Sequence, residues 1–385
     1  MKKKLSLVLA TLMLLGLLAG CGGQPAASGD KDTVVVYIGD IFNSMTPYMT
    51  TANSDQAVFD QVYETLTVTK DDGAVAPCLA KSWKMSDDCL EYTFQLEEGV
   101  KFHNGEVMTA DDVVYSFEQY LANPAKNNFV SMIDKVEMVD ANTVKVTLNK
   151  ITPLFLVYIN ELPILNKKFV EEHNGNISDV ACGTGPYKLT SIDLATSAML
   201  ERNDDYRLAP AAIEKVELRY VGDRSTASVQ LETGDLDIMS IDPSQLVSFE
   251  NNDKFTVEKV QTLKTALLAI NTTVAPLDNK LVRQAMTYAV DKKSVITIAY
   301  ENCAVPARLQ ASDTNCFGVD FSDATDFSYN PEKAKELLAE AGYPNGLNFA
   351  DYGIQMDVLG GTYMEKAAQV MQQNFADVGI TIELR

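Results

Sequence analysis

The sequence is short of basic residues and of histidine. Of its 385 residues, 32 are Lys or Arg against 53 Asp or Glu, the formal net charge is −21, and only His103 and His173 represent histidine. Nucleic-acid binding needs clustered Lys and Arg, so this balance argues against a nucleic-acid partner. Neither histidine has the His-Glu-x-x-His spacing of a zinc enzyme, and no Cys-x-x-Cys pair exists. We therefore expect no metal site and no cofactor.

Motifs of enzymes are also absent. There is no Gly-x-Ser-x-Gly elbow. The stretch Gly-Thr-Gly-Pro-Tyr-Lys at 183–188 is not a phosphate loop, because such a loop needs Lys followed by Ser or Thr opening a helix, and Pro186 lacks an N–H. Its glycines predict a tight turn or a close backbone approach instead. We expect no enzymatic activity; the alternative, an extracytoplasmic hydrolase, would be decided by turnover assays.

Two isolated residues have structural interpretations. His103 lies in "VKFHNGE", a predicted turn, and is expected to be a structural histidine with its hydrogen bonds satisfied. Trp83 is the only tryptophan, and its place in a predicted hairpin favours core packing over ligand stacking.

The N-terminus has the pattern of an exported protein. Three lysines precede an apolar stretch of signal-peptide length, too short to span a membrane comfortably, which ends in Leu-Ala-Gly-Cys. This box resembles a bacterial lipoprotein signal, which implies removal of 1–20 and a diacylglycerol on Cys21. Residues 21–32, rich in Gly, Ser, Pro and Ala, predict a flexible tether. We expect a protein anchored by its N-terminal lipid to the outer face of the cell membrane; an ordinary secretory signal is the alternative.

Five cysteines remain after Cys21. An odd number cannot all pair, and two pairs flank short loops and are candidate disulfides: Cys303 with Cys316, and Cys78 with Cys89. Free thiols are the alternative.

Strands and helices alternate along the whole chain, which predicts an α/β protein with mixed sheets. Hydrophobic patterning predicts strands at 33–39, 215–221, 265–271 and 380–384, hairpins at 81–96, 135–148 and 186–202, and helices at 54–66, 109–121, 224–234, 278–296, 330–342 and 363–379. Cap residues support several helices: Ser54, Thr109, Asp278 and Asn330 at the starts, and Gly234 and Gly342 at the ends.

These segments, in this order, resemble the solute-binding proteins of ABC importers in the peptide/nickel family, family 5. The similarity covers nearly all of 33–385. Its most specific part is 76–119, from "APCLAKSWKM" to "VVYSFEQ". Other matching segments are 45–66, 183–191, 200–207, 231–238, 269–295 and 329–346.

The resemblance implies a two-lobe periplasmic-binding-protein type II fold. Lobe I would comprise 33–54 and 181–265, with 55–180 inserted as a subdomain, and lobe II would be 266–385. In relatives the chain continues beyond the point that corresponds to "GITIELR", so we expect lobe II to be incomplete, with exposed edges at its last strand. The segment 183–187 would return the chain from the insertion into lobe I beside the cleft.

The resemblance also implies a function. The protein would bind peptides in an interlobe cleft and deliver them to an ABC permease powered by an ATPase. Alternatives are a binder of nickel, a metal chelate or an oligosaccharide, and a peptide-sensing receptor without transport. The stretch "QMDVLGGTYM" at 355–364 contains no Arg or Lys, which makes free dipeptides less expected, since some dipeptide binders hold the ligand carboxylate with a basic side chain near here.

Candidate ligand-binding residues follow from the resemblance. They lie in the first loop, at the 183–185 crossing, at the end of "LLAIN" and in the 357–362 loop. The candidates are Met45, Thr46, Tyr48, Thr51, Gly183, Thr184, Gly185, Asn271, Asp357 and Thr362. The alternative is that they shape the cleft without touching the ligand, and for Met45 and Tyr48 that they pack in the core.

Overall fold

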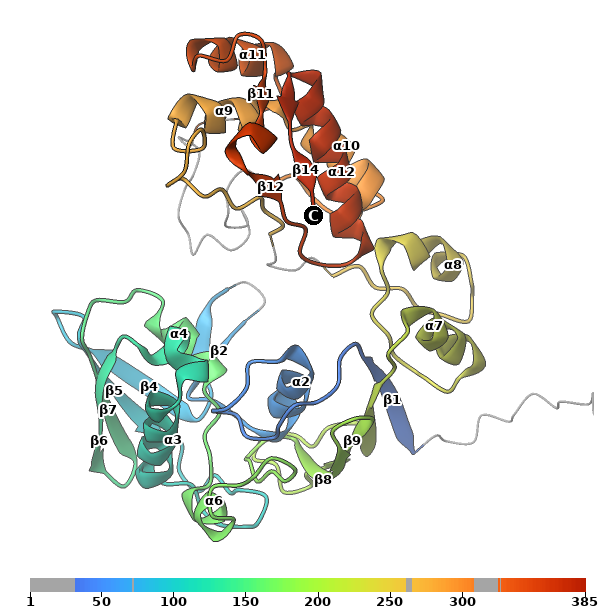
Figure 1. Ribbon diagram of the computed structural model, residues 1–385. Helices are drawn as coiled ribbons and strands as arrows, with labels where there is room; N and C mark the ends of the chain where they lie inside the picture. The colour runs from blue at the N-terminus through green and yellow to red at the C-terminus, as the bar shows by residue number, and fades with distance from the viewer. Residues whose placement is uncertain (1–31, 71–72, 261–264, 308–324, 326) are drawn as a thin grey trace, which may run out of the picture. The chain divides into compact units, whose positions relative to one another are not determined.

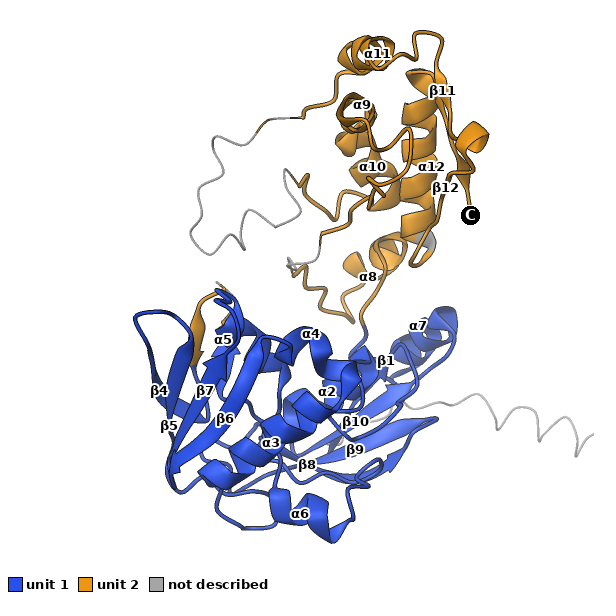
Figure 2. Cartoon of the chain, turned by 60° about the vertical axis from the view of Figure 1, so that its left-hand side comes forward, with its two compact units in different colours: residues 1–68, 77–239 blue, residues 69–76, 240–385 orange. Residues whose placement is uncertain are grey.

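The chain forms two compact units in the computed structural model, which describes residues 32–70, 73–260, 265–307, 325 and 327–385 (Figures 1 and 2). The first unit contains the chain up to Val68 together with Pro77–Met239, and the second contains Thr69–Ala76 and Ser240–Arg385. The division at Met239 precedes the predicted lobe boundary at 265, because the chain leaves the first unit's sheet after an isolated bridge between Ile238 and Val36.

One sheet of the first unit has the order β1-β10-β9-β8. β1 (Thr33–Ile38) pairs in parallel with β10 (Lys215–Tyr220), while β8 (Tyr187–Asp193) and β9 (Ser197–Arg202) form an antiparallel hairpin beside it. The strands and the hairpin predicted here are confirmed. The sheet is mixed, as expected for the fold class.

The second sheet of this unit is antiparallel, with the order β4-β5-β7-β6. Both predicted hairpins form it: β4 (Ala80–Met85) with β5 (Glu91–Leu96), and β6 (Ile133–Asp140) with β7 (Thr143–Leu148). Helix α3 (Ala110–Ala122) lies against it (Figure 1). Thr109 starts α3 as predicted, with Asp112 accepting hydrogen bonds from its N–H at 2.9 Å and its hydroxyl at 3.0 Å.

Shorter elements complete the first unit. They are α2 (Asn53–Val62), η1 (Pro124–Lys126), α4 (Asn127–Val130), α5 (Phe155–Tyr158), η2 (Ile159–Glu161), α6 (Lys167–Glu172) and α7 (Arg224–Thr233). The paired strands β2 (Thr67–Thr69) and β3 (Val75–Pro77) include the ends of Thr69–Ala76, the segment counted with the second unit. The predicted cap Ser54 is wrong: α2 begins one residue earlier, and the Ser54 hydroxyl donates to the carbonyl of Ile41 at 2.7 Å.

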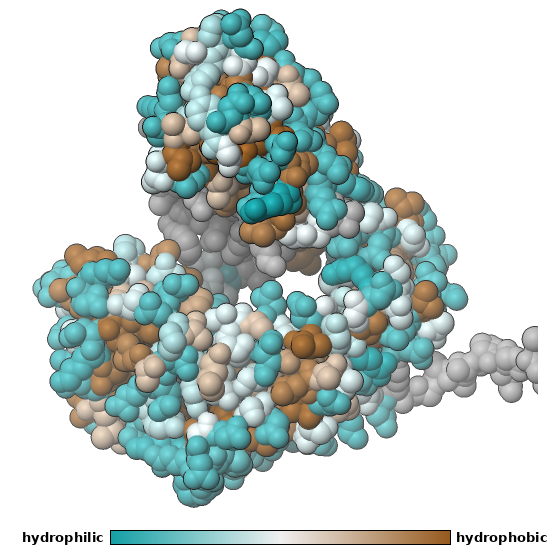
Figure 3. Space-filling model, viewed as in Figure 1, coloured by the Kyte–Doolittle hydropathy of each residue, from teal (hydrophilic) through white to brown (hydrophobic). Residues whose placement is uncertain are grey.

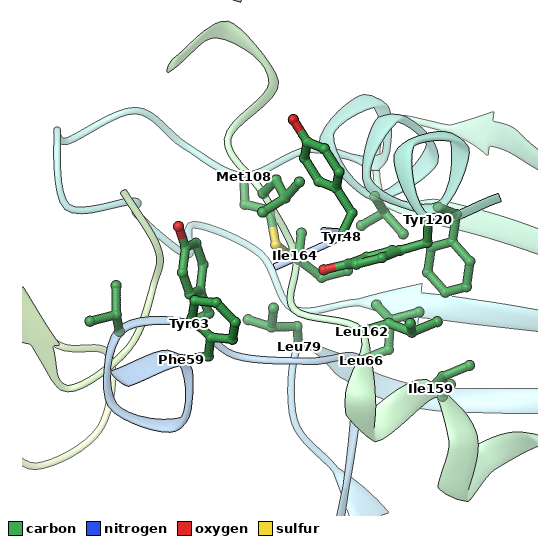
Figure 4. Packing of buried hydrophobic residues seen from close by; sticks show 14 of the residues in the cluster. Tyr48, Phe59, Tyr63, Leu66, Leu79, Met108, Tyr120, Ile159, Leu162 and Ile164 are labelled. Atoms are coloured by element: carbon green, nitrogen blue, oxygen red, sulfur yellow. The ribbon is translucent and has the colours of Figure 1, made fainter. Parts of the chain in front are cut away.

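One large hydrophobic core joins both sheets of the first unit, and a smaller cluster of Val35, Tyr37, Ala227 and Leu236 lies apart from it. The large core runs from Phe42 to Leu218, so the predicted insertion 55–180 shares its core with the flanking segments. Figure 4 shows part of it, where Tyr48 and Tyr120 pack edge to face at 6.5 Å between ring centroids. Trp83 packs against Phe94 beside this core, as predicted.

The second unit is mainly helical. Its elements are η3 (Pro243–Gln245), α8 (Leu246–Glu250), α9 (Lys280–Ala289), α10 (Lys292–Ala299), α11 (Pro331–Glu340), β11 (Leu347–Asn348), η5 (Phe349–Tyr352), β12 (Gln355–Met356), α12 (Thr362–Asp377), β13 (Ile380–Thr381) and β14 (Glu383–Leu384). Its core gathers side chains from α9, α11, α12 and the short strands.

Three predictions for the second unit are corrected. The helix expected at 278–296 is two helices, because the chain is extended at Val290 and Asp291 starts α10; Asn279, rather than Asp278, starts α9. The segment 265–271 is irregular and leaves Leu267 half exposed. The last strand has partners, since β13 pairs with β11 and β14 with β12.

Candidate functional site

A pocket of about 530 Å³ lies at the N-terminal end of α2 in the first unit. The loop that precedes the helix forms most of its wall, and no lining side chain is charged. The lining residues are Asn43, Ser44, Met49, Thr50, Thr51, Ala52 and Ala125. Of the predicted first-loop residues, the structure places only Thr51 on this surface.

The other first-loop candidates lie beneath the surface. Met45 is fully buried in the core, Thr46 is buried, and Tyr48 donates a hydrogen bond from its hydroxyl to the carbonyl of Gly175 at 3.1 Å. Burial raises the pKa of Tyr48. In the first unit these three side chains therefore support the pocket loop from behind, and the structure does not bring them to the pocket wall.

The 183–185 segment crosses directly over the end of α2. A Cβ at Gly183 would lie 2.0 Å from the carbonyl oxygen of Val62, and one at Gly185 would lie 2.5 Å from that of Gln61. The Gly185 N–H donates to the Val62 carbonyl at 2.9 Å. These glycines are needed for close approach between backbones, as the sequence predicted. All three residues are buried, and within the described part of the chain the hydroxyl oxygen of Thr184 has no hydrogen-bond partner.

His103 holds this crossing in place. The backbone N–H of His103 donates to the carbonyl of Gly183 at 2.9 Å. In the imidazole ring, Nδ1 lies 3.3 Å from the Gly183 nitrogen and Nε2 lies 3.0 Å from the Gly185 carbonyl oxygen. Because Nδ1 accepts, the ring proton is assigned to Nε2. Burial lowers the pKa of His103 to about 4. The predicted structural role of this histidine is confirmed.

The three ligand-binding candidates of the second unit, Asn271, Asp357 and Thr362, each have a different local environment. Asn271 is exposed and its side chain accepts from the N–H and hydroxyl of Thr273, which forms a local turn. Asp357 pairs with both nitrogens of the Arg385 fork, at 2.7 and 2.8 Å. Thr362 is the first residue of α12.

Arg385 was missed by the sequence analysis. It supplies a cation beside a loop that has none of its own, because β14 runs parallel to β12 and ends next to Asp357. Sequence distance hides this pairing, and no local motif signals it. Met49 and Asn43 were missed as well, although both belong to the loop that was expected to contribute.

Known proteins are similar to this chain in sequence and in structure. The family model of the bacterial extracellular solute-binding proteins, family 5 Middle, matches residues 74–385. This chain belongs to that family.

Family members of known name bind different solutes. Heme-binding protein A of Haemophilus influenzae is 30% identical over 99% of this chain and 76% of its own length. Glutathione-binding protein GsiB of Pectobacterium atrosepticum is 30% identical over 97% and 72%, respectively. The periplasmic binding protein DppA of Helicobacter pylori, solved with the peptide STSA, is 28% identical, with a TM-score of 0.75 over 92% of this chain and 73% of that one.

Membership confirms the predicted fold class and the absence of enzymatic activity, because family 5 proteins are extracytoplasmic binding proteins with the α/β fold of periplasmic binding proteins. Among the described residues, no group of three or more His, Cys, Asp or Glu side chains is placed to hold a metal ion. Within the same residues, no helix has the length and apolar character needed to cross a bilayer.

The predicted disulfide between Cys78 and Cys89 is wrong. Both are free thiols, since Cys78 precedes β4 and Cys89 lies in the turn after it, at opposite ends of a six-residue strand. A disulfide needs Cα atoms within about 7 Å. Cys303 is also an exposed free thiol, and Cys316 lies outside the described residues.

Cys78 instead borders an ion pair between the buried Glu64 and the more exposed Arg207. Glu64 accepts from Arg207 at 2.7 Å and from the Tyr206 hydroxyl at 3.0 Å, and the Cys78 sulfur lies 3.6 Å from the Glu64 carboxylate. Burial raises the pKa of the Cys78 thiol to about 11. This family member therefore keeps Cys78 as an inert thiol at neutral pH.

Proposed function

We propose that this protein is a lipid-anchored receptor on the outer face of the cell membrane that binds peptides and delivers them to an ABC import permease and its ATPase. The observation that carries the proposal is the pocket at the start of α2, which combines an amide, hydroxyl groups and a thioether without any charged side chain. Such groups suit the uncharged backbone and side chains of a peptide. The Leu-Ala-Gly-Cys box at Cys21 supports the anchor.

The proposal assigns candidate ligand residues to each unit by itself. Solute-binding proteins close two lobes on a ligand, and a ligand shifts the equilibrium only by its preference for the closed state. In the first unit the candidates are the pocket at the N-terminal end of α2 and, at the other end of that helix, Gly183, Thr184 and Gly185. In the second unit they are Asn271, Asp357 and Thr362, and the guanidinium of Arg385 is paired with Asp357.

A panel of solutes tests the peptide proposal. Isothermal titration of the purified full chain should show saturable binding of the peptide STSA, and the melting temperature should rise with its concentration, as it must for a ligand that binds only the native state. Haem, glutathione and the nickel–histidine complex are the comparison ligands. Preferential binding of one of these would contradict the peptide proposal while leaving family membership intact.

Glutathione or haem is the second candidate, favoured by the two curated relatives that are 30% identical. Glutathione is peptide-like and would suit the same uncharged pocket. Haem is less well supported, because the ring nitrogens of His103 are committed to the backbone of the 183–185 crossing. The same titration panel separates the two.

Transport and sensing need a cellular test. In cells that use STSA as a source of amino acids, deletion of the gene should abolish growth on the peptide, and the wild-type chain should restore it while a Cys21→Ser chain, released from the membrane, should not. Normal growth of the deletion strain would support a sensory role.

A further inference from the structure

Asp55 occupies an unusual position behind the pocket. It lies in the first turn of α2, is fully buried, and accepts two hydrogen bonds, from the Asn43 N–H at 2.7 Å and from the Thr50 hydroxyl at 2.6 Å. The Thr50 hydroxyl oxygen in turn accepts from the Ala52 N–H at 3.1 Å. Asn43 and Thr50 both line the pocket, so one carboxylate ties together the two ends of the loop that forms its wall.

The charge of Asp55 is balanced by the helix. No Lys, Arg or His of the described residues forms an ion pair with it, but it lies at the N-terminal turn of α2, where free N–H groups favour a negative charge. An anionic group in the pocket would face this carboxylate across one layer of side chains and would find no cation on the wall. A cationic group would find no accessible carboxylate, because Asp55 is covered and both its oxygens are used.

Groups available to a ligand are all neutral. The Asn43 amide and the Thr51 hydroxyl are exposed and have no hydrogen-bond partner among the described residues. An amide donates and accepts together, which matches a peptide group or a hydroxyl. Met49 is 59% exposed at the same wall and offers an adaptable apolar surface.

We propose that this pocket receives an uncharged, amide- or hydroxyl-bearing part of the solute, and that Asp55 is the positioning residue that shapes it. Asn43 and Thr51 hydrogen-bond this part of the solute, and Met49 packs against its apolar portion. The proposal rests on the proposed solute-binding function and specifies the chemistry that one wall selects.

The positioning role is tested without any ligand. In Asp55→Ala both acceptor oxygens are lost, so the Asn43 N–H and the Thr50 hydroxyl lose the carboxylate to which they donate. Amide hydrogen exchange at Asn43 should become at least about tenfold faster. Asp60→Ala, on the exposed side of the same helix, is the matched control and should leave this exchange unchanged. Unchanged exchange at Asn43 in Asp55→Ala would overturn the positioning role.

The selectivity is tested with the peptide STSA and four variants, each carrying one Asp in place of a residue. Against the wild-type chain, at least one of these should bind at least about tenfold more weakly than STSA, because it would bring a carboxylate close to Asp55. The penalty at that position should shrink in Asp55→Asn and persist in Asp60→Asn. Equal affinity for all five peptides, or a penalty that Asp55→Asn leaves unchanged, would overturn the selectivity.

Failure of the proposed function is distinguishable from failure of this inference. If the wild-type chain binds none of the five peptides, the peptide proposal fails and the selectivity claim fails with it, while the exchange measurement still decides the role of Asp55. If the peptides bind and the penalty does not depend on Asp55, only the inference fails.

Discussion

His103 should make the stability of the first unit depend on pH between 7 and 4. An unperturbed histidine has a pKa of about 6.5, and burial lowers the pKa of His103 to about 4. Between these values the unfolded chain binds a proton that the native chain does not. The contribution of the neutral ring is therefore fully present above pH 6.5 and is lost as the pH falls toward 4.

The magnitude follows from the two pKa values. Linkage gives a loss of about 2 kcal/mol in the free energy of unfolding between pH 7 and pH 5. The cause is burial of the ring at the crossing, where Nδ1 also accepts from the Gly183 N–H and so must be unprotonated. His103→Asn keeps an acceptor oxygen near this position and removes the titration.

Urea unfolding at pH 7, 6 and 5, followed through the fluorescence of Trp83, measures this difference in the first unit. The free energy of unfolding of the wild-type chain should fall by about 2 kcal/mol more than that of His103→Asn over this range. His173 is present in both proteins, so its contribution cancels from the difference. Parallel pH profiles for the two proteins would refute the reasoning.

Three further substitutions test other parts of the first unit. Gly183→Ala should destabilise the first unit by at least about 3 kcal/mol in urea unfolding, because the new Cβ would overlap a carbonyl oxygen. The control Gly39→Ala, whose Cβ would make only ordinary contacts, should cost under about 1 kcal/mol. Equal costs for the two variants would refute the close approach of the backbones at Gly183. Glu64→Gln should lower the free energy of unfolding by about 2 kcal/mol, and adding Arg207→Met in a double variant should recover part of this loss. Fully additive losses would contradict an energetic coupling between Glu64 and Arg207. Lys126→Met should leave the melting temperature unchanged or raise it, since burial lowers the pKa of this ammonium, and its contacts among the described residues are a 3.5 Å hydrogen bond to the Glu161 carbonyl and the Phe129 ring at 5.7 Å. A clear decrease would show that the charge is needed.

Local sequence patterns predicted those elements whose structure is determined mainly by local interactions. The hairpins formed because alternation and turn residues coincided with a core on one side. Asn330 starts α11 and accepts from the Lys333 N–H at 2.9 Å, and Gly234 ends α7 with a positive φ of 84°. The 183–185 glycines were interpreted correctly because Pro186 excluded a phosphate loop on chemical grounds.

Predictions failed where partners come from elsewhere in the chain. The apolar segment 265–271 looked like a buried strand, but no described strand pairs with it. For the helix expected at 278–296, the prediction followed the continuous apolar pattern and overlooked Asp291 as the start of a new helix. The Asp291 side chain accepts a hydrogen bond from the Lys293 N–H at 3.1 Å. β-propensity and helical periodicity predict local structure only weakly, and contacts with distant parts of the chain override them.

The site was the part least predictable from sequence. For Met45 and Tyr48 the sequence left ligand contact and core packing open, and the loop turns both side chains into the core. Asp55 could not be singled out because one acidic residue in a helix start normally signals only a favourable dipole interaction. Its two hydrogen bonds to the loop depend on how that loop folds back, which no spacing rule encodes.

The polarity of the surface agrees with an extracytoplasmic protein of net charge −21. Figure 3 shows hydrophilic residues over much of the visible face of each unit, with hydrophobic residues in separate patches. Such a surface keeps a protein soluble and offers charge to a partner, which fits docking on a permease.

Native mass spectrometry of the full chain, purified without unfolding from its own cells, tests the central claim most directly. The account predicts that a population of the protein carries peptides, which are released on denaturation and identified by sequencing, and that these carry uncharged residues at one fixed position. Release of haem, a metal chelate or a sugar in place of peptides would contradict it.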